Sequence, residues 1–233
     1  MTTDTCGIAD VTMAAAATMD NVPSYSPPSF GQFVALSVNI VVQIFISFVA
    51  VYMSYMCFKL KLKKTAFHAW FCSIGYCCLM AEGMMTFYEG NALMHPFDNY
   101  TKTTIHLVLS AAGGLMGMIG SLQKFLEVKK HFYTFHGKIG LFATCLCIFS
   151  FTSGIASLYI EDKKKVVHTI ISLIVFSAGM CAQYTGYETS FFKRKVDPEM
   201  KLLFKYLVIV IVVLSCISPV KGMLIFFAGK IFS

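Results

Sequence analysis

Long apolar runs alternate with short polar connectors along most of the chain. Six runs approach the ~20 residues that a helix needs to cross the hydrocarbon core of a bilayer. They cover residues 33–58, 66–88, 104–125, 137–159, 166–188 and 202–227. Each run is continuously apolar and lacks the alternation of a barrel strand, and a backbone in lipid must satisfy its own hydrogen bonds. The pattern therefore predicts an all-α integral membrane protein with six transmembrane helices.

The composition supports this fold class. Of the 233 residues, 57% are hydrophobic and only 13% are charged, which excludes an ordinary soluble domain. The polar segment 1–32 is expected to be a disordered tail, residues 33–227 one six-helix domain with its core at 66–190, and residues 228–233 a short tail. The N-terminal segment lacks the basic start of a secretory signal, so the first run is expected to act as an uncleaved signal anchor.

Four consecutive runs each carry a histidine near their first turn. These residues are His68, His106, His136 and His168. Successive helices cross the membrane in opposite directions, so His68 and His136 are expected near one face, and His106 and His168 near the other. Helix direction therefore allows two pairs, one at each face. The pairs would lie roughly 20 Å apart in a hydrocarbon core of ~30 Å.

A pair of imidazoles suits haem better than other metal centres. A lone histidine in a membrane helix usually makes an inter-helix hydrogen bond, but four in register need a shared explanation. Two imidazoles are too few for structural zinc, whereas haem iron takes one axial ligand on each side of the ring. We therefore predict two haem b groups, each held by two histidines. The nine cysteines include no CxxCH motif, so the haems would be bound non-covalently, and the cysteines are expected to be small buried hydrophobes.

Small residues follow the histidines at helical spacing. The helix that begins near His106 carries Ser110, Gly113, Gly117 and Gly120 on one face. Such spacing favours close helix packing, but it would also leave room for the edge of a porphyrin. The pattern is repeated after His136 and His168, which supports the porphyrin alternative, and both interpretations stay open.

Other polar residues interrupt the apolar runs. Glu82 shares a helix face with His68 and is a candidate for proton coupling, because an ionisable residue at membrane depth is often functional. A protonated, hydrogen-bonded structural role is the alternative. In the first run, Asn39 and Gln43 share a face that is expected to contact another helix. In the last run, Pro219 predicts a kink.

Basic side chains flank both histidine pairs. Near His106 and His168, the candidates for holding an anionic reductant are Lys102, Lys163, Lys164 and Lys165. Near the other pair, the candidates for substrate contact are His131, five residues before His136, and Lys138. The alternative is that these connectors orient the helices or contact lipid head groups.

Three segments resemble the cytochrome b561 family. One is HAWFCSIGYCCLMAEGMMTF, which resembles its pattern H-P-x-x-M-x-x-x-x-x-x-M-x-E, with Ala69 in place of the proline and a glutamate, Glu82, near the end of the segment. Another is HFYTFHGKIG, similar to the segment in which a His or Asn precedes the third haem ligand by five residues. The last is KTTIHLVL, which resembles the segment with a basic residue ahead of the second ligand. The chain is thus similar, over about residues 66–190, to the short members that consist of this domain alone.

The resemblance implies a six-helix bundle whose central four helices hold two b-type haems, through His68 with His136 and His106 with His168. It also implies an ascorbate-dependent transmembrane oxidoreductase, with ascorbate as donor on one side and monodehydroascorbate or ferric chelates as acceptor on the other. The longer basic ascorbate-binding motif of other members is reduced here to Lys102 and its neighbours. We expect an endomembrane location, in the endoplasmic reticulum or a vesicle rather than the plasma membrane, with lipid contacts, a homodimer as a candidate assembly and no nucleic-acid partner.

Function and orientation each keep an alternative. A di-haem membrane subunit that serves a quinol or a partner reductase is the nearest rival function, and a haem-free transporter or scaffold is the rival from another class. By the positive-inside rule, the His68/His136 face, which carries most of the 19 Lys and Arg residues, is cytosolic. The family resemblance instead implies cytosolic termini and ascorbate oxidation at the His106/His168 face.

Overall fold

The structure is a computed structural model that describes residues 29–159 and 162–231. Side chains are described throughout these ranges except at positions 162–165, 230 and 231. Within the described ranges the chain forms helices and no strand, which confirms the all-α prediction. The tail predicted for residues 1–32 lies outside the described residues as far as position 28.

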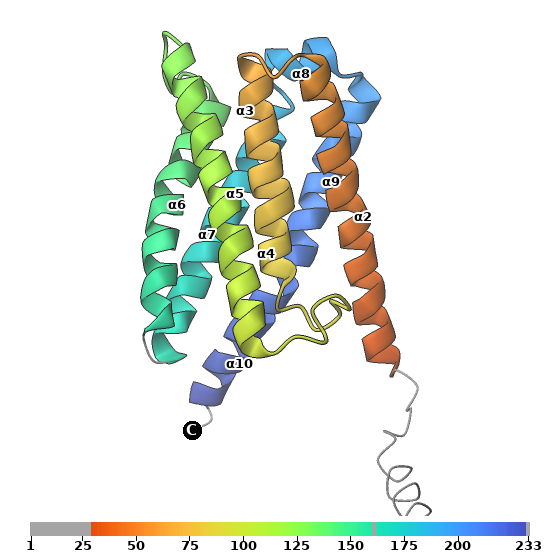
Figure 1. Cartoon of the computed structure of the whole chain (residues 1–233), viewed down its shortest axis with the longest axis vertical. Helices are drawn as coiled ribbons and strands as arrows, with labels where there is room; N and C mark the ends of the chain where they lie inside the picture. Colours follow the sequence, from red (N-terminus) through yellow and green to blue (C-terminus); the bar gives the residue numbers. More distant parts are fainter. Residues whose placement is uncertain (1–28, 160–161, 232–233) are drawn as a thin grey trace, which may run out of the picture.

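The helices pack as an elongated bundle (Figure 1). In chain order they are α2 (Phe30–Lys59), α3 (Thr65–Cys72), η1 (Ser73–Met80), α4 (Ala81–Met85), α5 (Asn99–Glu127), α6 (Phe135–Leu158), α7 (Asp162–Gly186), α8 (Ser190–Lys195), α9 (Pro198–Ser215) and α10 (Ile217–Ile231). Among the described residues, five stretches are long and apolar enough to cross a membrane, namely α2, α5, α6, residues 166–186 of α7, and residues 198–229 of α9 and α10. The second predicted run forms one further rod, because α3, η1 and α4 follow one another without a gap.

Side-chain caps fix where several helices begin. Ser29 and Gln32 form a capping box, in which the Ser29 N–H donates to Gln32 Oε1 at 2.7 Å and the Gln32 N–H donates to Ser29 Oγ at 3.3 Å. Because of this box, α2 begins at Phe30, three residues before the start of the predicted apolar run. Asp98 caps α5 by accepting the Thr101 N–H at 2.9 Å.

The second rod contains a π-helix, η1, whose wider turns shift the side chains that follow it. As a result, Glu82 contacts α2, where Gln43 Nε2 donates to Glu82 Oε2 at 2.7 Å. The prediction that Glu82 shares a face with His68 is therefore wrong, because it assumed α-helical spacing across η1. The prediction that Gln43 contacts another helix is confirmed.

The last run is broken between α9 and α10. Pro219 has no N–H with which to bond the carbonyl of Ser215, the last residue of α9. The helix breaks at Cys216 and resumes at Ile217, so the predicted kink is confirmed. The end of the run differs from the expectation, since α10 continues to Ile231 into the segment predicted as a short tail.

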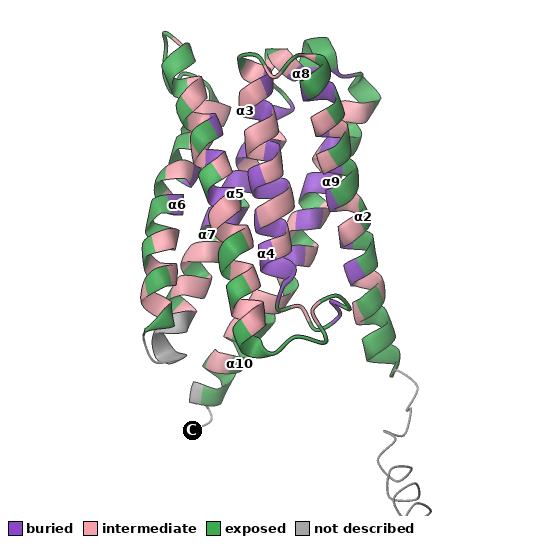
Figure 2. Ribbon diagram, in the orientation of Figure 1, coloured by how far each residue is buried: buried purple, intermediate pink, exposed green. Residues whose placement is uncertain are grey.

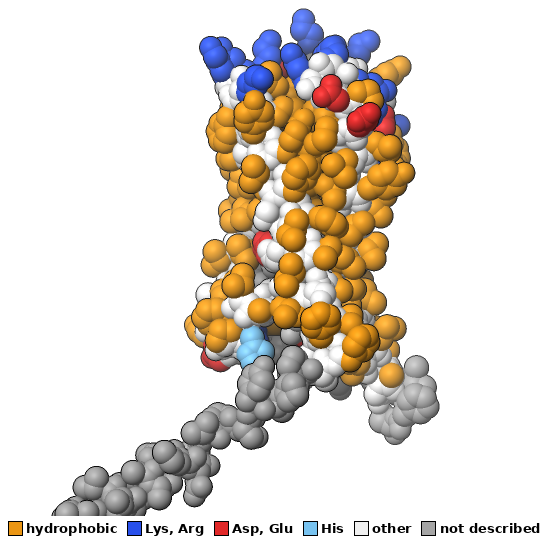
Figure 3. Space-filling model, turned by 90° about the vertical axis from the view of Figure 1, so that its right-hand side faces the viewer, with side chains coloured by type: hydrophobic (Ala, Val, Ile, Leu, Met, Phe, Trp, Pro, Cys, Tyr) orange, Lys and Arg blue, Asp and Glu red, His pale blue; other side chains and the backbone are white. Residues whose placement is uncertain are grey.

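The buried core lies where α2, η1, α7 and α9 meet, and Figure 2 shows buried positions along the inner faces of these rods. Large apolar side chains elsewhere point outward, as a lipid-facing surface requires. In Figure 3 they cover the flank of the bundle, and Lys and Arg side chains gather at one end. That end, where α2 ends and α3 begins, is called the basic end below. The end where α5 begins is called the opposite end.

Two histidine pairs as the candidate functional site

The fold brings the four histidines of the apolar runs together in two pairs. At the basic end, the ring centroids of His68 on α3 and His136 on α6 lie 5.8 Å apart, with 74° between the ring planes. At the opposite end, the centroids of His106 on α5 and His168 on α7 lie 6.3 Å apart, with 84° between the planes. Each pair therefore joins helices that are distant in sequence.

Hydrogen bonds between neighbouring rods hold His68 and His106 in place. His68 Nδ1 lies 3.0 Å from the Gly120 carbonyl oxygen on α5. In return, His106 Nδ1 on α5 lies 2.8 Å from the Gly83 carbonyl oxygen on α4. The α3–η1–α4 rod and α5 thus form a first hairpin, residues 65–127, in which each rod carries one histidine and one acceptor for its neighbour's histidine. At 1.5 Å per helical residue, His106 and Gly120 place the two pairs about 20 Å apart.

Helices α6 and α7 form a second hairpin, residues 135–186, with the same reciprocal arrangement. His136 Nδ1 on α6 lies 2.9 Å from the Ala182 carbonyl oxygen on α7. His168 Nδ1 on α7 lies 3.2 Å from Ser153 Oγ on α6. Each histidine pair is therefore made of one residue from each hairpin.

These partners determine which ring nitrogen carries the proton. A carbonyl oxygen only accepts hydrogen bonds, so His68, His106 and His136 must each donate a proton from Nδ1. Ser153 Oγ donates its own proton to the Ser150 carbonyl oxygen at 3.0 Å, which leaves a lone pair to accept from His168. All four neutral imidazoles consequently keep the lone pair of Nε2 for another partner.

The spacing within each pair fits axial ligation of one iron. Metal–nitrogen bonds of about 2 Å, with each ring centroid roughly 1 Å behind its nitrogen, place two axial imidazoles about 6 Å apart. The separations of 5.8 and 6.3 Å lie on either side of that value. Protonated Nδ1 atoms and available Nε2 lone pairs are also what haem ligation requires, so the residues present fit haem.

A cavity of about 750 Å³ adjoins the pair at the basic end. This volume falls within the range of about 300–1,000 Å³ that is usual for cofactor pockets. Buried Tyr76 forms part of its wall, with its ring against α5 and α7 where Gly117 and Gly179 have no side chain. A Cβ atom at Gly117 would lie 2.5 Å from Tyr76 Cε2. The glycines thus make room for the tyrosine ring.

The glycines along one face of α5 mainly allow close packing against the rod formed by α3, η1 and α4. A Cβ atom at Gly113 would lie 2.6 Å from the Gly75 carbonyl oxygen, and one at Gly120 would lie 2.9 Å from Phe71 Cβ. Beside the rings themselves, Gly154 lies against His168 and Gly186 against His136. The helix-packing interpretation of the small residues is therefore confirmed for α5, whereas the porphyrin interpretation stays a prediction.

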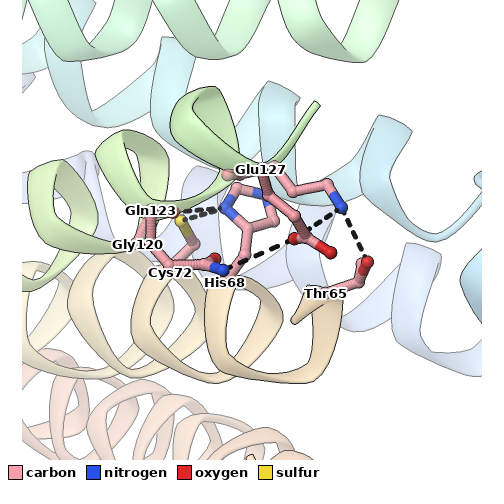
Figure 4. A network of polar contacts seen from close by, with 7 residues as sticks. Thr65, His68, Cys72, Gly120, Gln123 and Glu127 are labelled. Carbon is pink, nitrogen blue, oxygen red and sulfur yellow. Dashed lines mark hydrogen bonds and ion pairs between the residues drawn. The ribbon is translucent and has the colours of Figure 1, made fainter. Parts of the chain in front are cut away.

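Lys124 lines this cavity and bonds to Thr65 and Glu127, which belong to the polar network shown in Figure 4. Its Nζ donates to Thr65 Oγ1 at 2.7 Å and to Glu127 Oε2 at 3.1 Å. Lys130 and Arg194 also line the cavity. Sequence reasoning did not single out Lys124 or Arg194 as site residues, although Lys124 lies one helical turn beyond Gly120 and could have been found from that spacing.

The remaining predicted site residues have different surroundings. His131 lines the cavity and stacks on Phe125, with ring centroids 4.2 Å apart, whereas exposed Lys138 is not among the lining residues. Half-buried Lys102 lies in the first turn of α5 at the opposite end. The side chains of Lys163, Lys164 and Lys165 lie outside the described residues. The carboxylate of Glu82 faces α2 rather than either pair.

A membrane-spanning helical bundle that holds paired imidazoles at both ends has the architecture of a membrane cytochrome. The model of the eukaryotic cytochrome b561 family matches residues 67–193, more than half of the chain, and the chain belongs to this family. The match includes all four paired histidines. The protein is therefore a haem b cytochrome that transfers electrons across a membrane. No curated protein matches the chain.

Proposed function

We propose that the protein binds two haem b groups, one between His68 and His136 and one between His106 and His168. It passes single electrons from ascorbate at one membrane surface to monodehydroascorbate or ferric chelates at the other. The observation that carries this proposal is the presence of two imidazole pairs at opposite ends of one bundle, each with its Nδ1 protons already bonded.

The chain's own residues orient the imidazoles and keep water out of part of the interior. Haem bound at a pair supplies a reversible one-electron carrier near that surface. The Nδ1 hydrogen bonds fix the plane of each imidazole before any ligand arrives, which lowers the cost of ordering on binding. The apolar rings of Tyr76 and Phe176 are both buried, which keeps their part of the interior closed to solvent. Substrates therefore react at the two surfaces without crossing the bundle.

Cations at the basic end favour an anionic substrate there. Lys130 and Arg194 line the cavity together with Lys124. Nearby acidic charge has other partners, because a hydrogen bond from Lys205 lowers the pKa of Glu188 and keeps this carboxylate ionised beside lysines of α9. Because Lys124 is itself paired with Glu127, we expect Lys130 and Arg194 to be the main cavity cations that attract ascorbate or a carboxylate-rich ferric chelate. Exposed Lys138 adds to this field, and His131 lines the cavity as a further candidate for substrate contact.

A reduced-minus-oxidised spectrum of the detergent-purified protein tests the proposal. We expect sharp b-type bands, two haems per chain, and partial reduction on addition of ascorbate alone. One haem per chain would contradict the two-site assignment. Two haems without any reduction by ascorbate would instead favour a subunit that serves a quinol or a partner reductase.

Lys102 provides a test of docking at the opposite end. Hydrogen bonds from the side chain and the backbone N–H of Thr101 lower the pKa of neighbouring Asp98, so this carboxylate stays ionised and offsets part of the lysine charge. We therefore expect Lys102→Ala to slow reduction by ascorbate by only roughly three- to tenfold at low ionic strength. The haem spectrum and reduction by dithionite should not change.

The matched control for Lys102 is Lys221→Ala, which removes a lysine at the same end that is paired with Glu89 at 2.8 Å. This control should reduce at the wild-type rate. Equal rates in Lys102→Ala and wild type, measured by stopped-flow absorbance, would assign Lys102 to helix orientation rather than to docking.

A further inference from the structure

His168 differs from the other paired histidines in its hydrogen-bond partner. His68, His106 and His136 each bond a main-chain carbonyl oxygen at 2.8 to 3.0 Å. His168 bonds a side-chain hydroxyl, Ser153 Oγ, at the longer distance of 3.2 Å. It is therefore the paired histidine whose acceptor can be changed by replacing a single side chain.

Hydroxyl groups from α6 and α7 surround the His168 ring. Ser172 Oγ lies 3.5 Å from His168 Nδ1 and 3.4 Å from Nε2, along the edge of the ring. Ser150 Oγ lies 3.4 Å from Ser172 Oγ, and the Ser150 carbonyl oxygen accepts a hydrogen bond from the Ser153 hydroxyl. At Gly154, an added Cβ atom would lie 3.1 Å from His168 Cε1. Ser153 is thus the oriented acceptor, and Ser172 is a weaker neighbour.

The strength of the Nδ1 hydrogen bond affects the iron on the other side of the ring. A strong acceptor polarises the N–H bond and makes the imidazole more basic, which favours the ferric state. The longer bond to a hydroxyl oxygen polarises His168 less than the shorter carbonyl bonds polarise its counterparts. His168 is therefore the least electron-rich of the four imidazoles.

We propose that Ser153 is a positioning residue that lowers the reduction potential of the His106/His168 site through its hydrogen bond with His168 Nδ1, but by less than a carbonyl acceptor would. This inference rests on the proposed two-haem function. Cations such as Lys124 raise the reduction potential of the other site, at the basic end. The proposal therefore concerns the shift on substitution at position 153, not the order of the two potentials.

A spectroelectrochemical titration of the purified holoprotein tests the inference. Ser153→Ala leaves the Nδ1 proton without its oriented acceptor, so the midpoint potential of one of the two haem components should rise. That component should be the one that His168→Ala removes. Ser153→Thr keeps the hydroxyl and should restore the wild-type potential. Ser153→Ala/Ser172→Ala removes the second hydroxyl as well and should give the largest shift.

Two further variants make the outcome decisive. Ser157→Ala removes a hydroxyl from the same helix that donates to the Gly154 carbonyl at 2.7 Å, and both potentials should stay unchanged. Ser153→Cys offers sulfur, a weaker acceptor of similar size, and should give a smaller upward shift if Ser153→Ala fails to fold. Unchanged potentials in Ser153→Ala and Ser153→Cys, a downward shift, or equal shifts of both components would overturn the inference. A wild-type protein with fewer than two haems would instead overturn the proposed function.

Discussion

The double variant His68→Ala/His136→Ala should retain about one haem per chain, whereas His68→Ala/His106→Ala should retain almost none. The first removes one complete pair and leaves the other, about 20 Å away along the bundle, intact. The second removes one axial ligand from each pair, and each remaining imidazole is left alone in an apolar site. Haem content per purified chain, measured by pyridine haemochrome absorbance, separates the two outcomes.

Single variants sharpen the same test. His68→Ala and His136→Ala should lose the same spectral component, and His106→Ala and His168→Ala the other. His95→Ala and His131→Ala should keep both haems, since these two exposed side chains lie outside the pairs. Loss of both haems from a folded His68→Ala/His136→Ala variant would show that the assignment of ligands is wrong, as would a dependence on His131 equal to that on His136.

Gly75→Ala should destabilise the bundle by about 3 kcal/mol, near the upper end of typical overpacking costs. Its Cβ atom would lie 2.5 Å from the Gly113 carbonyl oxygen and 2.9 Å from the Gly117 nitrogen. Both contacts are main-chain atoms of α5, so no flexible side chain can move aside. We expect a lower apparent melting temperature in detergent and loss of both haems together as the protein unfolds.

The control for Gly75 is Gly222→Ala on α10, where an added Cβ would meet nothing within 4 Å among the described residues outside the backbone of its own helix and its two chain neighbours. Alanine favours helix more than glycine does, so this variant should be neutral or slightly stabilising. If the Gly75→Ala protein had the same apparent melting temperature as the wild type, η1 and α5 would have to lie farther apart than the structure shows.

The fold could be predicted from hydropathy because lipid leaves the chain few alternatives. Runs of apolar residues identified the helices, and alternating helix direction was enough to pair His68 with His136. Local details were harder to predict. The start of α2 depends on the capping box of Ser29 and Gln32, and the orientation of Glu82 depends on a π-helix that hydropathy does not show.

The partners of the histidines could not be predicted for a different reason. Gly83, Gly120 and Ala182 act through main-chain carbonyls, so their side chains carry no sign of the role. These carbonyl acceptors can be identified only once the packing of the helices is known. The same holds for Arg194, which reaches the cavity from α8, a short helix outside the haem core that the sequence predicted.

The reciprocal construction of the two hairpins has a consequence for biogenesis. Residues 65–127 leave the ribosome first and carry His68 and His106, one from each pair. Residues 135–186 follow and carry the other two. A nascent chain that ends before α6 thus presents two single imidazoles and no complete pair, however well its own helices are inserted. Under the proposed two-haem function, cofactor capture at either end is therefore a property of the docked hairpins, and both sites form in the same assembly event.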